Sequence, residues 1–180
     1  MNSEIKESFE KTRVAGSIAS GALDEVAKLI KPGITTHKID DLCYEFINDH
    51  GAYSAPLYYR GFPKSCCTSV NHIVCHGIPS DKILEEGDIL NVDVTAFKNG
   101  WHGDTSRMFE VGNVSIKAKK LVKTTYEAMM NAIKILKPFF FAFNNSLICF
   151  VPLDVIASGN SAFFGFLFKV TFLTSKKALN

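Results

Sequence analysis

The sequence predicts an α+β fold, because two helical patterns precede a strand–turn–strand pattern and a third helical pattern follows it. Apolar residues recur with helical spacing over about residues 3–30 and 36–51. The dipeptide Asn99-Gly100 separates two stretches with strand preference. Helical spacing returns over about residues 115–136. The 180 residues fit one domain of ordinary size, and a hydrophobic content of 47% allows a substantial core.

The first helix is expected from about Ser3 to Ile30, where Lys31-Pro32-Gly33 ends it. The second is expected to begin near Thr36, because threonine is a favoured N-cap residue, and to end at Gly51. The apolar positions that define them are Ile18, Leu23, Val26, Ala27 and Ile30 in the first helix and Ile39, Leu42, Cys43, Phe46 and Ile47 in the second.

Loop and strand signals follow the second helix. Residues 52–64 are rich in tyrosine, proline and glycine and are expected to form a loop, and residues 65–70 a strand. Glu86-Gly87-Asp88 favours a turn that leads into a hairpin over residues 89–109. The side chains that favour strand structure in its first half are Val92, Val94 and Phe97.

The hairpin places two aspartates on one face of the predicted sheet. With Asn99-Gly100 as a two-residue turn, paired positions sum to 199, so Asp104 lies opposite Thr95. Asp93 is two residues from Thr95 and points to the same face. The two carboxylates become diagonal neighbours about 7–8 Å apart at the backbone. They are near enough to bridge two divalent ions such as Mn²⁺, Co²⁺, Fe²⁺ or Zn²⁺.

The alternative for Asp93 and Asp104 is a pair of solvated carboxylates without a ligand, since clustered carboxylates are only probabilistic markers of function. His102 is expected on the opposite face from Asp104, in a structural role. Cys66 and Cys67 are expected to fill core space. The five cysteines are odd in number and form no C-x-x-C pair, which favours reduced thiols in a cytoplasmic protein.

Charge gives little support for a nucleic-acid partner. Residues 1–138 contain 17 basic and 17 acidic side chains and are therefore neutral. The N-terminus lacks the apolar segment of a signal peptide. The sequence thus predicts a protein with no nucleic-acid partner and no clear membrane segment.

Residues 139–180 differ in composition from residues 1–138. They contain ten of the fifteen phenylalanines and neither histidine nor glutamate. No helical or alternating period persists. A membrane segment is one interpretation, but Pro152, Asp154 and Asn160 interrupt the apolar run. The composition favours a tail read out of frame or joined from elsewhere, so the chain divides into 1–138 and 139–180.

Four motifs occur in order along the chain: Tyr59-Arg60-Gly61-Phe62-Pro63-Lys64-Ser65, Val74-Cys75-His76-Gly77-Ile78-Pro79, Asn91-Val92-Asp93-Val94-Thr95 and Gly103-Asp104-Thr105-Ser106-Arg107-Met108-Phe109. Together they resemble the type I methionine aminopeptidases, which are pita-bread metallopeptidases of peptidase family M24. The resemblance runs from about residue 3 to Pro138 and covers the first half of that family's catalytic domain. It implies an antiparallel sheet with covering helices, the N-terminal half of the pita-bread fold.

The resemblance implies removal of the initiator methionine from nascent polypeptides by a dinuclear site that holds Co, Mn, Fe or Zn. Asp93 and Asp104 match metal ligands. His76 matches a catalytic histidine that contacts the substrate near the scissile amide. The walls of the methionine pocket match Tyr59, Phe62 and Cys67. The resemblance also implies a cytoplasmic location and, as a property of the family, association with the ribosome.

The family completes its site with one histidine and two glutamates from the second half of its domain. In this sequence the last histidine is His102 and the last glutamate is Glu127. The chain is therefore expected to be truncated or frameshifted and inactive alone, with Val92 and Val94 in need of a cover that the missing half would supply. The alternative is a non-catalytic pita-bread remnant or a protein-binding module.

Overall fold

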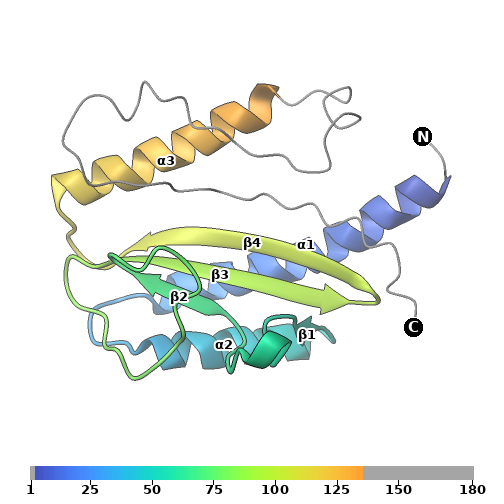
Figure 1. Ribbon diagram of the computed structural model, residues 1–180, viewed down its shortest axis with the longest axis horizontal. Helices are drawn as coiled ribbons and strands as arrows, with labels where there is room; N and C mark the ends of the chain where they lie inside the picture. The colour runs from blue at the N-terminus through green and yellow to red at the C-terminus, as the bar shows by residue number, and fades with distance from the viewer. Residues whose placement is uncertain (1–2, 136–180) are drawn as a thin grey trace. The chain divides into compact units, whose positions relative to one another are not determined.

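The computed structural model describes residues 3–135 and divides the chain into two units, residues 1–119 and 120–180. The boundary expected at residue 138 and the phenylalanine-rich tail lie outside the described residues. The elements follow in order along the chain (Figure 1). They are α1 (Ser3–Leu29), α2 (Thr36–Asp49), β1 (Tyr53–Ser54), the 3-10 turn η1 (Tyr59–Gly61), β2 (Cys67–Val70), β3 (Ile89–Lys98), β4 (Trp101–Glu110) and α3 (Ile116–Ile135).

The sheet is antiparallel and has β3 at its centre. Strands β1 and β2 both pair with one edge of β3, and β4 pairs with the other edge. Tyr53 of β1 lies opposite Phe97, and Cys67 of β2 lies opposite Asp93. The predicted α+β class, with an antiparallel sheet and covering helices, is confirmed.

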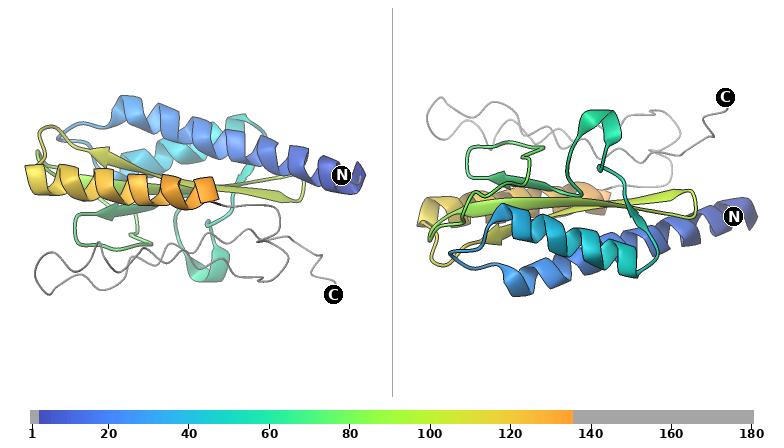
Figure 2. Two further views of the ribbon diagram at one scale, coloured as in Figure 1. Left: turned by 90° about the horizontal axis from the view of Figure 1, so that it is seen from above. Right: turned by 90° about the horizontal axis from the view of Figure 1, so that it is seen from below.

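Helices α1 and α2 cover one face of the sheet, as the two views in Figure 2 show. Alternate residues of β3 point into this layer, and Leu90, Val92, Val94 and Ala96 are fully buried there. The helices contribute small or branched side chains to the same core, namely Ala19, Ala22, Leu23 and Val26 from α1 and Ile39, Cys43 and Ile47 from α2. The expectation that Val92 and Val94 need a cover from the second half is wrong, because these helices already bury them.

Two features of the segment between α2 and β3 differ from the predictions. Strand β2 begins at Cys67 rather than Ser65, because Asp40 of α2 accepts hydrogen bonds from the backbone nitrogens of Ser65 and Cys66. These two N–H groups are therefore unavailable to the sheet. Within the predicted loop, Tyr53-Ser54 forms the short strand β1, which the loop composition did not indicate.

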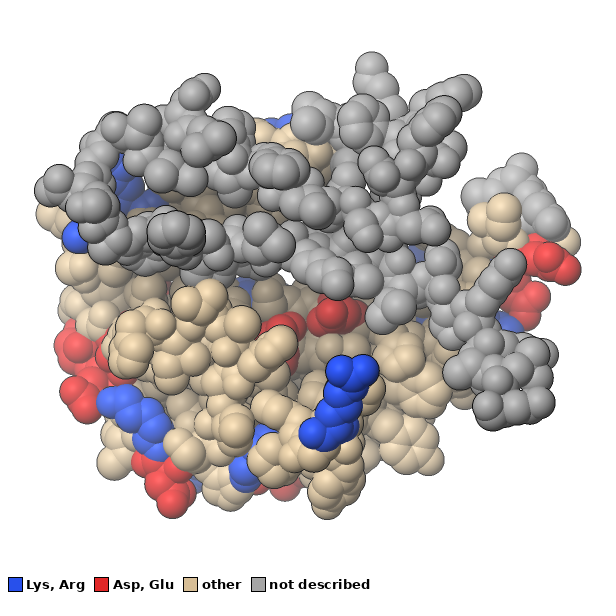
Figure 3. Space-filling model, in the orientation of Figure 1, with Lys and Arg blue, Asp and Glu red and all other residues tan. Residues whose placement is uncertain are grey.

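The charged side chains on the face in Figure 3 are interspersed, and the described residues form no extended patch of one sign there. This agrees with the equal numbers of acidic and basic side chains in residues 1–138. Among residues 3–135, no helix has the length and apolar character needed to cross a membrane.

Candidate metal centre

The β3–β4 hairpin places Asp93 and Asp104 on the same face of the sheet, as predicted. Asn99 and Gly100 form its two-residue turn with φ values of 52° and 86°, the left-handed conformation that such a turn requires. Asp104 lies opposite Thr95, and Asp93 lies opposite Ser106. The face that carries both carboxylates is opposite to the one covered by α1 and α2, because Val92 and Val94 alternate with Asp93 and Thr95.

The two carboxylates interact electrostatically. The pKa of Asp93 is raised from 3.8 to about 6, first because the group is partly buried and then because of the negative charge of Asp104. A hydrogen bond with Asp104 raises this pKa further, whereas His76 lowers it. Thr95 Oγ1 donates a hydrogen bond of 3.0 Å to Asp104 Oδ1 and orients that carboxylate. A cation between the two groups would relieve their repulsion.

His76 reaches this face through a strained loop. Its φ is 54°, a left-handed value that is uncommon for a residue with a side chain and that clusters at functional sites. The next residue, Gly77, lies directly against β2. The backbone nitrogen of Thr68 donates to Gly77 O at 2.7 Å, and the Gly77 nitrogen donates to Ser69 Oγ at 3.2 Å. A Cβ on Gly77 would overlap the carbonyl of Thr68, so only glycine fits.

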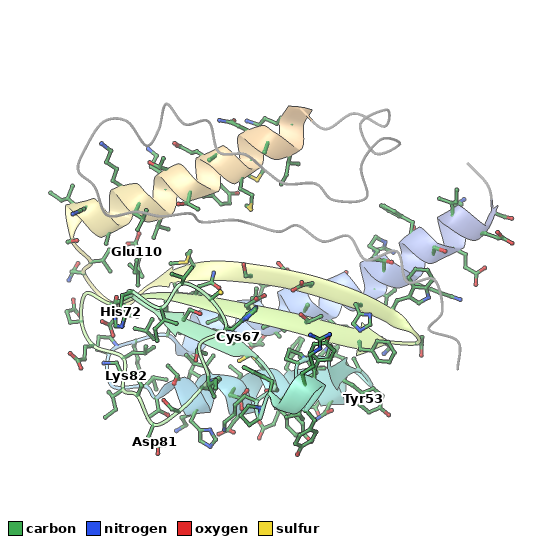
Figure 4. The ribbon with its side chains drawn as sticks, viewed as in Figure 1. Tyr53, Cys67, His72, Asp81, Lys82 and Glu110 are labelled. Carbon is green, nitrogen blue, oxygen red and sulfur yellow. The ribbon has the colours of Figure 1, made fainter. Side chains whose placement is uncertain are left out.

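Cys67 completes the group of predicted residues that the fold brings together. It lies on β2 (Figure 4), is 8% exposed and is directly opposite Asp93 in the ladder. Burial raises the pKa of its thiol to about 12, and the charge of Asp93 adds to this effect. The thiol is therefore protonated near pH 7, and a role for Cys67 as a wall of the methionine pocket stays a prediction.

Tyr59 and Phe62 lie on the segment between β1 and β2. Tyr59 is 64% exposed, and its ring contacts the Arg60 guanidinium at 5.5 Å. Phe62 is partly buried, and its backbone closes a tight turn with Tyr58 and Tyr59. This segment is unusual in its backbone, since Tyr58 and Arg60 both have positive φ values. A role for these two aromatic residues in a methionine pocket stays a prediction.

The predicted position of His102 is wrong. It lies opposite Phe97, two residues from Thr95, and therefore on the same face as Asp104. Its ring packs against Phe97 with 4.7 Å between the centroids. Side chains repeat every two residues along a strand, so positions 102 and 104 necessarily share a face.

A second polar cluster, formed by His37, Asp40, Asp41 and Lys64, was not predicted from the sequence. Its first three members have ligand atoms within 4.8 Å of one another. However, Lys64 Nζ lies 2.7 Å from His37 Nδ1 and 3.6 Å from Asp40 Oδ2. The ammonium group already supplies the positive charge. Asp40 also accepts hydrogen bonds from Ser65 and Cys66, so the cluster anchors the start of β2 to α2.

The buried cysteines are core residues, as predicted for Cys66. Cys43 and Cys66 are both fully buried in the cluster between α2 and the sheet. A hydrogen bond to Cys43, together with burial, raises the pKa of the Cys66 thiol well above its usual range. The four cysteines among residues 3–135 are free thiols.

The helix-covered antiparallel sheet, with two carboxylates on one face of its central hairpin, is the arrangement of the pita-bread metallopeptidases. The sequence pattern of metallopeptidase family M24 matches residues 10–141, and the chain belongs to this family. Divalent metal binding is therefore a property of its family. The hairpin residues fit such an ion, because their paired carboxylates are hard oxygen donors whose mutual repulsion a cation would relieve.

Specific relatives agree with this assignment. The methionine aminopeptidase of Rickettsia prowazekii (strain Madrid E) is 55% identical over 130 residues, which cover 72% of this chain and 50% of the relative. Its crystal structure has a TM-score of 0.69 over 69% of this chain and 50% of that one. The crystal structure of methionine aminopeptidase from Thermotoga maritima has a TM-score of 0.72 at 38% identity, over 73% of this chain and 53% of that one. The chain spans about half the length of these relatives.

Proposed function

We propose that this chain is the N-terminal part of a methionine aminopeptidase, which removes the initiator methionine from nascent polypeptides. The observation that carries the proposal is the position of Asp93 and Asp104 on one face of the hairpin, at the expected register. The identity of 55% to a methionine aminopeptidase runs through the same segment and supports it. The family domain would occupy residues 1–138, with residues 139–180 as a separate tail.

Asp93 and Asp104 would hold two divalent ions, from among Co, Mn, Fe and Zn. Bound ions of this kind supply Lewis-acid chemistry that makes water nucleophilic near pH 7. The contribution of the protein is to hold the two carboxylates in place. Thr95 fixes the orientation of Asp104 by donating to one of its oxygens. The backbone hydrogen bonds of the β3–β4 ladder fix the separation of the two aspartates.

His76 would contact the substrate near the scissile amide. His76 is exposed and lies close enough to Asp93 to lower the pKa of that carboxyl. The next residue, Gly77, packs against the Thr68 carbonyl and holds the loop in place. Cys67, Tyr59 and Phe62 would line the pocket for the methionine side chain. The protonated thiol of Cys67 suits this role because it is a small apolar group that does not compete for the metal.

We further propose that the chain alone has no peptidase activity. Two carboxylates are too few ligands to retain two divalent ions against water, and catalytic sites of this class need several protein ligands. The sequence contains no histidine beyond His102 and no glutamate beyond Glu127. One histidine and two glutamates, the remaining ligands that the family resemblance implies, would have to come from outside these 180 residues. A cytoplasmic location and ribosome association are further parts of the proposal that rest on the family.

A non-catalytic role is the second candidate. The chain would then be a remnant of the family or a module that binds protein. The specific observation that favours this role is the same incomplete ligand set, combined with a well-packed core that does not depend on the metal site.

Metal binding and activity can be tested separately. Because two carboxylates cannot retain two ions, electron paramagnetic resonance with excess Mn²⁺ should detect weak binding of a single ion, which Asp93→Asn and Asp104→Asn each weaken at least tenfold. Asp81→Asn is the matched control, since Asp81 is exposed and lies away from the hairpin (Figure 4). A Met-Ala-Ser peptide should remain uncleaved with Mn²⁺ or Co²⁺. Cleavage that Asp93→Asn abolishes would disprove the predicted inactivity, and Mn²⁺ binding insensitive to both hairpin variants would disprove the metal site.

A further inference from the structure

A groove lies between α1, α2 and the end of β3, on the helix-covered side of the sheet. The two helices are side by side there, as Figure 2 shows. The groove has a volume of about 430 Å³, and residues of all three elements line it. Small-molecule sites in proteins begin at about 300 Å³. Because Asp93 and Asp104 project from the opposite face of the sheet, the groove is separate from the candidate metal centre.

The floor of the groove consists of the apolar side chains of Val14, Ile18 and Phe46. Val14 and Ile18 are four residues apart on α1 and therefore share a face, where Val14 is 43% exposed and Ile18 is buried. The ring of Phe46 packs against α1 at Gly21, where a Cβ would lie 2.9 Å from the ring Cζ atom. The floor thus offers apolar surface that an apolar ligand group can remove from water.

His50 extends this floor and leaves one ring nitrogen available. Its ring stacks on Phe46 with 4.1 Å between the centroids and 28° between the planes. His50 Nδ1 lies 2.7 Å from the Phe46 carbonyl oxygen. A carbonyl can only accept a hydrogen bond, so Nδ1 carries the hydrogen. The other nitrogen, Nε2, has no partner among residues 3–135 and is left for a ligand.

The rim of the groove carries two cationic side chains, Arg13 and Lys98. Arg13 is already paired with Glu10 at 2.8 Å. Lys98 follows the even-numbered β3 residues that point toward the helices, so its side chain lies on their side of the sheet. Its ammonium group donates to the His50 carbonyl, which is an uncharged acceptor. Within residues 3–135 no carboxylate pairs with Lys98, and the rim therefore has one uncompensated positive charge.

We propose that this groove binds a small aryl carboxylate, in which a short link joins an aromatic ring to one carboxylate group. The ring would lie on Ile18 and Phe46, and the carboxylate would pair with the Lys98 ammonium. Aromatic pairs gain energy beyond the area that they bury, and charge-assisted hydrogen bonds are stronger than neutral ones. One uncompensated cation matches a single negative charge, which favours a monocarboxylate over a doubly charged phosphate ester.

Nuclear magnetic resonance of the ¹⁵N-labelled full chain tests the proposal, with phenylacetate as the probe and EDTA present. The amide signals of Ser17, His50 and Lys98 should shift together and saturate, with a dissociation constant on the order of 1 mM for a ligand of this size. Phenylacetamide has the same shape without the charge, and acetate has the charge without the ring. Each should bind at least about tenfold more weakly than phenylacetate.

Two variants address the charge at the rim. Lys98→Met keeps an unbranched side chain and should weaken phenylacetate binding at least about tenfold. Lys28→Met is the matched control, because it makes the same change of charge at an exposed position on α1, about 15 Å further along the helix than Ile18. Val14→Asp places a carboxylate on the exposed part of the floor and should abolish binding by repulsion. This variant leaves the hydrogen bond of Lys98 to α2 intact, so it decides the result if Lys98→Met loosens that end of the helix.

Several outcomes would overturn the proposal. Phenylacetamide binding as tight as phenylacetate binding would show that the charge takes no part. Equal phenylacetate affinity in Lys98→Met and Lys28→Met, or in Val14→Asp and the wild type, would exclude the groove. Shifts confined to the β3–β4 hairpin would place the ligand elsewhere, and shifts that do not saturate by about 10 mM would mean that no site exists. Because metal is absent throughout, none of these results bears on the proposed function.

Discussion

Gly103 of β4 lies directly against the backbone of Gly16 in α1. A Cβ on Gly103 would overlap the Gly16 nitrogen and the Ala15 carbonyl carbon, so the helix approaches the strand more closely than any side chain would permit. Gly103 immediately precedes Asp104 in the chain. The glycine of the Gly103-Asp104 motif thus sets the position of α1, and Asp104 points to the other face of the same strand.

Gly103→Ala should destabilise the fold by about 2–3 kcal/mol or more, because the added methyl group meets backbone rather than a flexible side chain. Gly16→Ala is the matched control. A Cβ on Gly16 meets nothing within 4 Å, and alanine is favoured over glycine in a helix by up to about 1 kcal/mol. Urea denaturation should therefore move the two midpoints in opposite directions. Equal effects at the two sites would show that the helix and strand can separate at little cost.

The second prediction concerns pH. The pKa of Asp93 is raised to about 6, so the folded state holds its proton more tightly than the unfolded state, where the pKa is about 4. In the absence of metal, the contribution of Asp93 to the free energy of unfolding should therefore be greatest below pH 4. This contribution should fall as the pH rises from about 4 to about 6. The loss is about 3 kcal/mol and is complete about one pH unit above the folded-state pKa. Asp93→Asn should remove this slope and stabilise the protein at pH 7.

The measurement is the free energy of unfolding from urea titrations between pH 4 and pH 7.5 in EDTA, for the wild type and Asp93→Asn. Asp81→Asn should keep the slope of the wild type, because Asp81 is exposed. If the wild type becomes more stable across this interval while Asp93→Asn runs parallel to it, the sign of the pKa shift is wrong.

The β3–β4 hairpin was predictable from sequence because a local rule determines it. The Asn99-Gly100 turn fixes the register, and the register fixes which side chains share a face. The same alternation determines the face of His102, because residues 102 and 104 are two positions apart on one strand. The sequence therefore contains the information that corrects the expected position of His102.

Contacts between distant segments were not predictable in the same way. Nothing near Asp40 in the sequence indicates that its carboxylate will bond to Ser65 and Cys66. The cover over Val92 and Val94 likewise depends on how α1 and α2 cross the sheet. Hydrophobic spacing shows that these helices have an apolar face but not which surface that face meets.

The loop that carries His76 provides the third prediction. Gly77→Ala should displace the loop, because a Cβ would overlap the Thr68 carbonyl. Ser69→Ala is milder and leaves the buried Gly77 N–H without its acceptor, at a cost of about 1–3 kcal/mol. Hydrogen exchange should show faster exchange at the Gly77 amide in Ser69→Ala, with the β3–β4 amides unchanged. Unaltered protection of Gly77 would mean that Ser69 does not hold the loop.

The last prediction separates two neighbouring aspartates in α2. Asp40 is 6% exposed and accepts hydrogen bonds from Ser65 N, Ser65 Oγ and Cys66 N, at 2.8, 2.6 and 3.1 Å. Asp40→Ala leaves these donors and the partly buried Lys64 ammonium without their acceptor, so it should cost about 3 kcal/mol or more. Asp41 is exposed, and its contact with His37 is 3.8 Å long, so Asp41→Ala should change stability by less than about 0.5 kcal/mol.

Both values can be measured by urea denaturation in EDTA and again in 1 mM Mn²⁺. Because the Lys64 ammonium already lies beside Asp40 and His37, Mn²⁺ should not change the difference between the two variants. A difference that grows in Mn²⁺ would instead identify His37, Asp40 and Asp41 as a second metal site.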